Sequence, residues 1–295
     1  MIRVLVVGGS APEGLAEKVA NEMGCEFVPV EKKSFPDGEI YVRILDDLEG
    51  EEVAVVQSTC YPPNQNYMEL FLLLDAAKDL GAEKVSAVIP YLAYARQDER
   101  FEPGEAVSLN TVAKLIESAG ADEVFMVDLH AHRIESVPET FGIPARNLTA
   151  APALAEYFDD KYDLNNPVAL GPDGEAEQWS KKAGEAIGAD WDFMIKKRLG
   201  PEKVEITPRE LDVEDRDVIL IDDIISTGGT MVEAIQILKN HGVGDIYVAC
   251  THPVLSGNAL DKIKGAGVME VIATDTIESE IGKVSVAPVI SEAFF

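Results

Sequence analysis

The sequence is poor in positive charge. Only 25 of its 295 residues are Lys or Arg, against 53 Asp or Glu, so the formal net charge at pH 7 is -28. A surface this acidic repels the phosphates of nucleic acids and of anionic lipids, which argues against both as partners and requires any phosphate site to be local. Because the acidic residues are spread along the chain, we hypothesise that they adapt the protein to high salt, where ions screen their mutual repulsion. The alternative is an ordinary solvated acidic surface.

Cysteine and long apolar runs are also scarce. The three cysteines, Cys25, Cys60 and Cys250, have spacings that suit neither a disulfide framework nor a CxxC metal site, so we expect free thiols. No apolar run approaches the roughly 20 residues that span a bilayer. The apolar start of the chain passes directly into Gly8 and Gly9, without the cationic start of a signal peptide. These features predict a cytoplasmic protein with no membrane association.

Short apolar runs alternate with segments of helical periodicity along the whole chain. This pattern is typical of parallel strands joined by crossover helices, so the predicted fold class is α/β. The predicted strands are 2–7, 53–57, 85–90, 124–129, 167–170, 191–195, 218–222, 246–250 and 269–273. The helices predicted between them include 12–23, 66–80, 108–119, 175–187 and 230–241.

The two halves of the sequence repeat each other. The segments that start at Val4 and Val53 match those that start at Val168 and Val218. Each matching segment is a predicted strand followed by a predicted helix, so the repeat indicates two copies of one α/β domain.

The boundary between the copies is expected near 142–147, where Pro144 interrupts the pattern. We therefore place the two domains at 1–145 and 146–295. We also expect the last residues of the chain to pack back onto the N-terminal domain.

The copies differ most in the segment 222–230, where the second copy has two carboxylates and then a Thr-Gly-Gly-Thr that opens a helix. Bare backbone N–H groups and two hydroxyls at the positive N-terminus of a helix form a cradle for phosphate. The carboxylates are repelled by phosphate, so we assign them to the hydroxyls of an attached sugar. The alternative is a capped helix with glycines in a tight turn. The proposed sugar-phosphate residues are Asp222, Asp223, Ser226, Thr227, Gly228, Gly229 and Thr230.

A family resemblance follows from this segment and three others. Val218 to Thr230 resembles the ribose-5-phosphate motif of type I phosphoribosyltransferases and of ribose-phosphate pyrophosphokinases. Phe35–Glu39, Tyr94–Asp98 and Val127–His132 resemble motifs of the second family alone, in its order, so that the resemblance covers essentially the whole chain. It implies an α/β protein with two tandem copies of a type I phosphoribosyltransferase-like domain, each a mainly parallel sheet flanked by helices, that works as a homo-oligomer. With the acidic composition, we expect a halophilic, archaeon-like source.

The resemblance also implies the reaction. Members of this family transfer the β,γ-pyrophosphoryl group of Mg-ATP to the 1-hydroxyl of ribose 5-phosphate, which gives phosphoribosyl pyrophosphate and AMP. On the ATP side, residues 35–39 resemble the family's adenine-binding loop, and residues 96–97 resemble its ATP-contacting pair. An aromatic face stacks on a base, carboxylates read its amino group, and an arginine pairs with phosphate. The residues carried over are Phe35, Asp37, Gly38, Glu39, Arg96 and Gln97.

Each of these two segments has a plainer alternative when taken alone. Residues 35–39 also suit a Pro-Asp-Gly turn. Arg96 also suits a surface salt bridge with Asp98 or Glu99.

Two residues resemble the family's Mg²⁺ positions. His130 follows the predicted strand 124–129, at the carboxyl edge where open α/β sheets place ligands, and Asp128, two positions before it on the same face, is a further candidate for the ion. Asp173 resembles the second metal position, in the pyrophosphate loop. There the chain departs from the family, because Glu175 and Ala176 stand where glycines are usual. Either Glu175 turns outward, or this part of the site binds pyrophosphate through metal.

Lys196 and Arg198 resemble the pair that opens the family's mobile catalytic loop. Alternation in a strand places both on one face and Lys197 on the other. Two cations there would stabilise the charge that builds up as the pyrophosphoryl group moves, and Arg198 would also contact ribose 5-phosphate. The turn-rich segment 199–203 would act as a lid. The alternative is a basic, solvent-facing strand end.

Two rival functions remain open. A phosphoribosyltransferase would consume phosphoribosyl pyrophosphate, and it would make no AMP from ATP and ribose 5-phosphate. A regulatory homologue would bind nucleotide or sugar phosphate without turnover.

Overall fold

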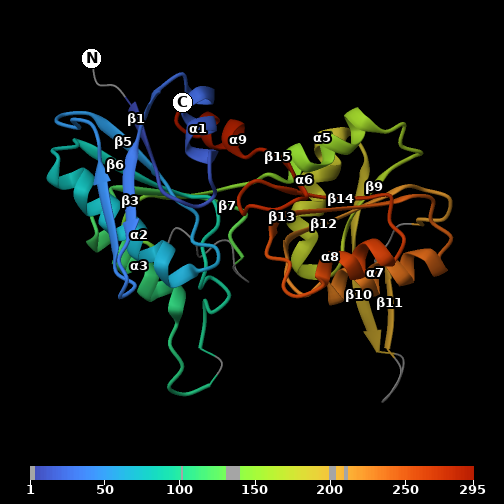
Figure 1. Cartoon of the computed structure of the whole chain (residues 1–295). Coiled ribbons are helices and arrows are strands. Elements are labelled where there is room, and N and C mark those ends of the chain that lie inside the picture. The colour runs from blue at the N-terminus through green and yellow to red at the C-terminus, as the bar shows by residue number, and fades with distance from the viewer. Residues whose placement is uncertain (1–3, 101, 131–139, 199–203, 209–211) are drawn as a thin grey trace. The chain divides into compact units, whose positions relative to one another are not determined.

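The computed structural model describes residues 4–100, 102–130, 140–198, 204–208 and 212–295, and the side chains of 196–198 and 204–208 lie outside that description. The chain forms two compact units (Figure 1). The N-terminal unit is Met1–Leu148, Thr276–Glu278 and Ser285–Phe295. The C-terminal unit is Thr149–Asp275 and Ser279–Val284. The chain therefore returns to the first unit at its end.

The N-terminal unit is built on a parallel sheet of strand order β2-β1-β5-β6-β7-β8. Its strands are β1 (Val4–Gly8), β2 (Glu26–Val28), β5 (Glu52–Val56), β6 (Lys84–Ile89), β7 (Glu123–Val127) and β8 (Ala145–Leu148). The helices are α1 (Leu15–Met23), α2 (Pro63–Asp79), α3 (Ser108–Ser118) and α9 (Ala287–Glu292). A separate antiparallel hairpin consists of β3 (Val30–Ser34) and β4 (Ile40–Ile44).

The C-terminal unit has the strand order β11-β10-β9-β12-β13-β14-β15, in which only β10 and β11 are antiparallel. Its strands are β9 (Val168–Gly171), β10 (Asp190–Arg198), β11 (Val204–Pro208), β12 (Val218–Ile225), β13 (Ile246–Pro253), β14 (Glu270–Thr274) and β15 (Gly282–Val284). Its helices are α5 (Ala151–Lys161), α6 (Glu177–Ile187), α7 (Gly229–Asn240) and α8 (Ala259–Gly265), with a 3-10 turn at Gly174–Ala176.

The strand orders confirm the predicted duplication. If β1 corresponds to β9 and β5 to β12, the order β2-β1-β5-β6-β7-β8 becomes β10-β9-β12-β13-β14-β15. Helices α1 and α6 follow the first strand of each copy, and α2 and α7 follow the next equivalent strand. The second copy adds β11 at its edge.

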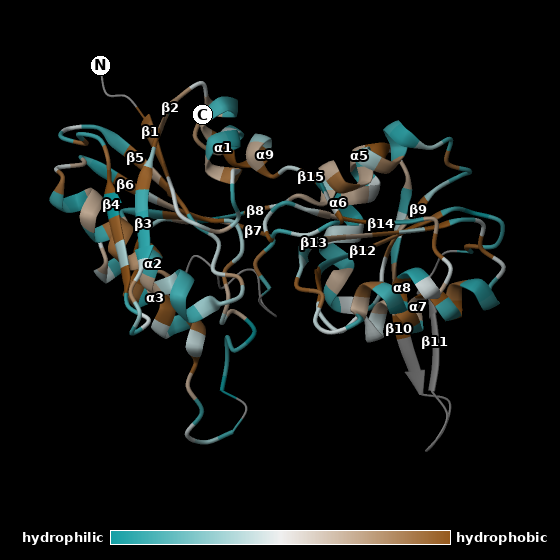
Figure 2. Ribbon diagram, in the orientation of Figure 1, coloured by the Kyte–Doolittle hydropathy of each residue, from teal (hydrophilic) through white to brown (hydrophobic). Residues whose placement is uncertain are grey.

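Both faces of each sheet are covered, which explains the continuous apolar strands. In β12, Val218 and Leu220 lie in the core with α7, whereas Ile219 and Ile221 lie in the core with α5 and α6. Figure 2 shows the same pattern, with brown in the strands and teal on the outer parts of the helices. No helix in the described part of the chain combines the length and hydrophobicity needed to cross a bilayer.

Three of the differences between the sequence-based expectations and the structure concern the bounds of a unit, a helix and a strand. The segment near Pro144, expected as a domain boundary, leads into strand β8, and the N-terminal unit continues to Leu148. The first helix begins at Leu15 instead of residue 12, because Gly14 before it has a left-handed backbone with φ 77°. The third difference is in β12, which continues to Ile225 instead of ending at Asp222.

The C-terminal segment is anchored in the N-terminal unit. Helix α9 packs on α1, and the ring of Phe294 stacks on Phe125 with centroids 4.7 Å apart. Nη1 of Arg146 donates to the carbonyl oxygen of Ala293 at 2.8 Å. The buried hydroxyl of Ser58 donates to the carbonyl oxygen of Thr276 at 2.8 Å. This unit is therefore complete only with residues from the far end of the chain.

Candidate active site

The predicted phosphate loop joins β12 to α7. Residues 226–228 form a bend, and Gly229 is the first residue of the helix. A neighbouring segment braces the bend, because Leu255 N donates to Ile225 O and Ser256 N donates to Ser226 O, both at 2.9 Å. The exposed residues of the loop are Thr227, Gly229 and Thr230. The loop is thus fixed on its buried side and open to solvent on the other, as a binding loop requires.

Gly228 makes the tight bend possible. Its φ of 75° lies in the left-handed region, and a Cβ at this position would lie 3.2 Å from the carbonyl oxygen of Ala259. A side chain would therefore be strained and crowded. Glycine here brings the start of α7 close to α8 and directs the first N–H groups of a 12-residue helix toward solvent.

Asp222 and Asp223 lie inside β12, because pairing with β13 continues through Ile225 opposite Pro253. The expectation that the strand ends at these carboxylates is therefore wrong. The sheet continues because Ile224 and Ile225 are apolar and extend the ladder. Each carboxylate accepts the next backbone N–H: Asp222 Oδ1 from Asp223 N at 2.9 Å, and Asp223 Oδ1 from Ile224 N at 2.7 Å. Both are held by the sheet and not by a mobile loop.

The carboxylates of the C-terminal unit crowd one another. Burial, and then the charges of Asp223 and Asp173, raise the pKa of Asp222 well above its usual value. A cation or the hydroxyl groups of a sugar would relieve this repulsion. The arrangement therefore fits either a sugar bound through its hydroxyls or a nearby metal ion.

The loop after β9 places Asp173 at the start of a 3-10 turn. Asp173 Oδ1 accepts from Glu175 N at 3.0 Å. The side chain of Glu175 is exposed, whereas Ala176 is buried and would lie 2.9 Å from a Cβ on Gly171. Of the two expectations for this departure from the family, the exposed position of Glu175 favours the outward one.

Lys196 and Arg198 are in β10, opposite Ile206 and Val204 of β11. Their backbones are therefore in a strand, as expected. Their side chains lie outside the described residues, as does the predicted lid at 199–203.

Residues 35–39 form the turn of the β3–β4 hairpin. Phe35 N donates to Glu39 O at 2.7 Å, and Gly38 has a φ of 95°. Phe35 is 47% exposed, so its ring is available for stacking on a base. Asp37, Gly38 and Glu39 also line a cavity of about 660 Å³, a volume in the range of ligand pockets. The predicted Pro-Asp-Gly turn and a binding loop are therefore compatible here.

Arg96 and Gln97 lie in the loop between β6 and α3. Arg96 is exposed. Gln97 is partly buried, and its Oε1 accepts from the hydroxyl of Ser108 at 3.1 Å, at the start of α3. Gln97 thus has a structural contact in addition to its predicted role.

Asp128 and His130 follow β7 at its carboxyl end. Asp128 is buried with a φ of 40°, and His130 is partly buried. Among the described residues no group of three His, Cys, Asp or Glu is arranged to hold a metal ion. Mg²⁺ commonly binds through one or two carboxylates together with substrate phosphates, so Asp128 and Asp173 each offer the type of oxygen donor that Mg²⁺ prefers.

One residue near these segments carries no signal in the sequence. Asn64, in the first turn of α2, lines the cavity beneath the hairpin turn and also accepts a hydrogen bond from Tyr94, two residues before Arg96. A single Asn after two prolines has no motif that would reveal this position.

Comparisons with known proteins agree with this arrangement. Residues 4–120 match the family described as the N-terminal domain of ribose phosphate pyrophosphokinase, and residues 139–286 match the phosphoribosyl transferase domain. The ribose-phosphate pyrophosphokinase of Methanothermobacter thermautotrophicus is 46% identical over 98% of this chain and 99% of its own. That of Methanopyrus kandleri is 43% identical over 98% of both chains.

A solved structure is similar over the whole length. The phosphoribosylpyrophosphate synthetase from Mycobacterium smegmatis has a TM-score of 0.86 at 31% identity, over 99% of this chain and 97% of that one. A family match across both units and this identity over nearly the full length lead to one conclusion. The chain belongs to the ribose-phosphate pyrophosphokinase family.

Proposed function

We propose that this protein is a ribose-phosphate diphosphokinase, which transfers the β,γ-pyrophosphoryl group of Mg-ATP to the 1-hydroxyl of ribose 5-phosphate. The products are phosphoribosyl pyrophosphate, a precursor in nucleotide biosynthesis, and AMP. The observation that carries the proposal is the end of β12 and the loop after it, in a chain of this family. Two carboxylates are fixed in the strand, and the loop leads to the open N-terminus of helix α7.

The sugar phosphate would bind to this loop. The N–H groups and hydroxyls of 226–230 would hold the 5-phosphate, which is favoured at the N-terminus of α7. Asp222, whose raised pKa reflects its crowded surroundings, would accept hydrogen bonds from the ribose hydroxyls, and Asp223 would assist it. Arg198 would contact the same substrate.

ATP would bind through the hairpin turn and the loop after β6. Phe35 would stack on the adenine and Arg96 would pair with a phosphate, since both side chains are exposed. The remaining residues assigned to ATP are Asp37, Gly38, Glu39 and Gln97.

Asp128, His130 and Asp173 would hold Mg²⁺, which neutralises phosphate charge when it is bound with ATP. Lys196 and Arg198 would stabilise the charge that develops on the moving pyrophosphoryl group. The 1-hydroxyl oxygen of the ribose forms a bond to the β-phosphorus as the bond from that phosphorus to the α,β-bridging oxygen breaks. The hydroxyl proton passes to solvent water, and AMP departs with the bridging oxygen. Most of the acceleration would come from alignment of the two substrates.

We also propose that the protein works in the cytoplasm as a homo-oligomer and at high salt. The thiols of Cys25, Cys60 and Cys250 are all free, which suits a reducing compartment. The oligomer is expected from the family resemblance, and the net charge of -28 supports the salt preference.

The test is product formation from ATP, Mg²⁺ and ribose 5-phosphate across a series from low to multimolar KCl. Equimolar AMP and phosphoribosyl pyrophosphate are expected, with activity that rises with salt. If no AMP forms at any salt although both substrates bind, the chain is a regulatory binder. If it instead consumes phosphoribosyl pyrophosphate with a base, it is a phosphoribosyltransferase. Activity that is highest at low salt would refute only the halophile hypothesis.

A further inference from the structure

The loop that carries Arg96 has an unusual backbone. Tyr94 has a φ of 66°, in the left-handed region. A tyrosine adopts this conformation only at a cost in free energy, so the surrounding structure must hold it there. Such a residue two positions before a predicted substrate contact raises the question of what holds it.

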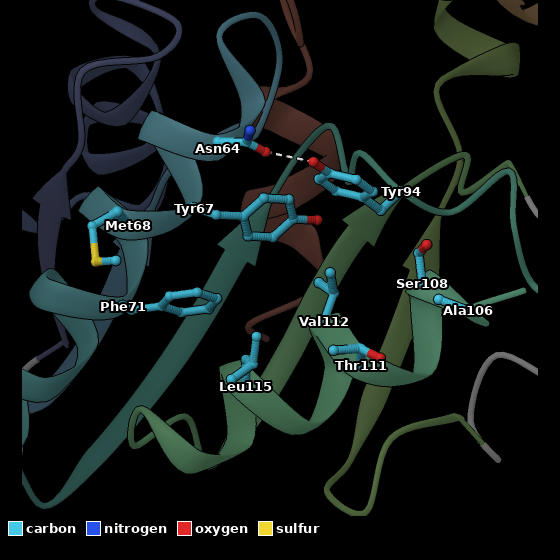
Figure 3. Close-up of a pocket in the computed structure, with 10 residues that line it drawn as sticks. All are labelled: Asn64, Tyr67, Met68, Phe71, Tyr94, Ala106, Ser108, Thr111, Val112 and Leu115. Carbon is cyan, nitrogen blue, oxygen red and sulfur yellow. Dashed lines mark hydrogen bonds between the residues drawn. The ribbon is translucent and has the colours of Figure 1, made fainter.

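Helix α2 contacts Tyr94 at two points (Figure 3). The hydroxyl of Tyr94 donates a hydrogen bond to Oδ1 of Asn64, in the first turn of the helix. The ring of Tyr94 packs against Tyr67, with centroids 5.8 Å apart and planes at 46°. The hydroxyl of Tyr67 in turn donates to the carbonyl oxygen of Ala93 at 2.6 Å. The helix therefore fixes both the side chain of Tyr94 and the backbone just before it.

The backbone after Arg96 is fixed as well. The carbonyl oxygen of Gln97 accepts from Leu109 N at 3.4 Å, and its side chain accepts from Ser108. Ala95, between Tyr94 and Arg96, is buried. Arg96 is thus an exposed side chain on a backbone held from both directions, which is how a guanidinium is aimed at a ligand at little cost in entropy.

Asn64 also faces the second predicted ATP segment. It lines the groove of about 320 Å³ drawn in Figure 3, together with Tyr94. It also lines the larger cavity beneath the hairpin turn, together with Asp37 and Glu39. One side chain in α2 therefore adjoins both parts of the chain that are assigned to ATP.

We propose that Asn64 is a positioning residue for ATP, which acts by holding Tyr94 and so the backbone that presents Arg96. The inference rests on the proposed function, in which Arg96 contacts ATP. Loss of the hydrogen bond would leave the Tyr94 backbone free to relax from its strained conformation and would displace Arg96. The bond lies at the surface, where one neutral hydrogen bond has a modest net value, so the effect on ATP binding should be about three- to tenfold.

The experiment compares Asn64→Ala and Tyr94→Phe with the full-length wild type in steady-state kinetics and thermal unfolding. Both variants should raise the KM for ATP about three- to tenfold, with kcat and the KM for ribose 5-phosphate within twofold and unfolding temperature nearly unchanged. Thr111→Val is the matched control, because Thr111 lines the same groove from α3 and should leave every constant unchanged.

The route through Arg96 is tested in a double-variant cycle. In an Arg96→Ala background, Asn64→Ala should raise the KM for ATP by less than 1.5-fold. The same increase with and without Arg96 would show that Asn64 acts elsewhere and would overturn the inference, as would an unchanged KM in Asn64→Ala. If Arg96→Ala alone leaves the KM for ATP unchanged while product formation persists, the assignment of Arg96 fails, and the inference fails with it although the proposed reaction stands.

Discussion

Replacing either of two adjacent glycines in the predicted phosphate loop by alanine is expected to affect a different property of the protein. One replacement should lower stability, and the other should weaken binding of ribose 5-phosphate. Gly228 has a φ of 75°, and a Cβ there would lie 3.2 Å from the carbonyl oxygen of Ala259 and 3.3 Å from Cδ1 of Ile263. A Cβ on Gly229 would meet Thr227 Oγ1 at 3.8 Å and no other described atom within 4 Å. The first position is therefore strained and crowded, whereas the second is open toward the expected phosphate.

The magnitudes follow from these contacts. The left-handed conformation costs alanine about 1–2 kcal/mol, and the backbone carbonyl of Ala259 cannot move away easily. For a domain near this size, each kcal/mol lowers Tm by about 2–4 °C, so Gly228→Ala should lower Tm by about 2–8 °C. In Gly229→Ala the helix gains a favourable residue, so Tm should stay level or rise slightly. The new methyl would occupy the space of the 5-phosphate and raise the KM for ribose 5-phosphate about tenfold or more.

The assay combines thermal unfolding of the substrate-free protein with KM measurements for both substrates. Each variant is the control for the other, because both replace a glycine with alanine and the two positions are adjacent in the chain. The reasoning is refuted if Gly228→Ala unfolds at the wild-type temperature. It is equally refuted if Gly229→Ala binds ribose 5-phosphate as well as the wild type, because the loop would then not hold the phosphate.

Three further predictions concern charge. The raised pKa of Asp222 means that the folded state favours the neutral carboxyl group. The folded protein is therefore most stable, with respect to this group, below about pH 4, and its free energy of unfolding falls as pH rises through the folded pKa. In the presence of EDTA, the Tm of Asp222→Asn should therefore be higher than that of the wild type at pH 7. Below about pH 4 the two Tm values should be equal. Equal Tm values at pH 7 would contradict the assignment of repulsion. Lys196→Ala should lower kcat about 10²–10³-fold and Lys197→Ala by less than about threefold, measured as AMP release. Finally, Tm should rise from low to multimolar KCl, and a flat profile would remove the halophile hypothesis.

The central strands were predictable because both faces of each sheet are buried. Strands such as β5 and β12 contain the apolar runs 53–56 and 218–221, and the positions of these runs in the repeat showed that the two strands are equivalent. The hairpin strand β3 was missed because Glu31, Lys32 and Lys33 leave it without an apolar run. The seven-residue helix α8 buries only Ala259 and Ile263, too few positions for a clear helical period.

The site was predictable where a motif combines several constraints. The loop at 222–230 was found because carboxylates, glycines and hydroxyls occur together after an apolar strand. The end of that strand was misplaced, because acidic residues suggest a loop and only the pairing of β12 with β13 reveals that they are in the sheet. Asn64 was not predictable at all, since its contact with Tyr94 joins residues from two elements that no spacing connects.

In the first copy, the positions equivalent to the acidic residues of the second copy hold uncharged side chains. Leu5 pairs with Val53 as Val168 pairs with Val218, so Gln57 and Ser58 occupy the positions of Asp222 and Asp223, and Ser10 that of Asp173. These side chains make hydrogen bonds within the unit itself, except for the buried Nε2 of Gln57, which has no partner among the described residues. Ser10 donates to the carboxylate of the buried Glu69, and Gln57 Oε1 accepts from Ala11 N at 3.2 Å. The hydroxyl of Ser58 accepts from Tyr91 N at 3.1 Å and donates to Thr276 O at 2.8 Å.

The same point of the fold therefore differs between the two copies. In the second copy, burial and the neighbouring charges of Asp223 and Asp173 raise the pKa of Asp222. In the first, the same strand end holds the loop at 91–97 and the returning C-terminal segment, which the N-terminal unit needs to be complete. Gln57 and Ser58 are fully buried, so acidic residues at these positions would place two charges in the interior without a cation or sugar to meet them. Two aspartates introduced at these positions would thus destabilise the N-terminal unit.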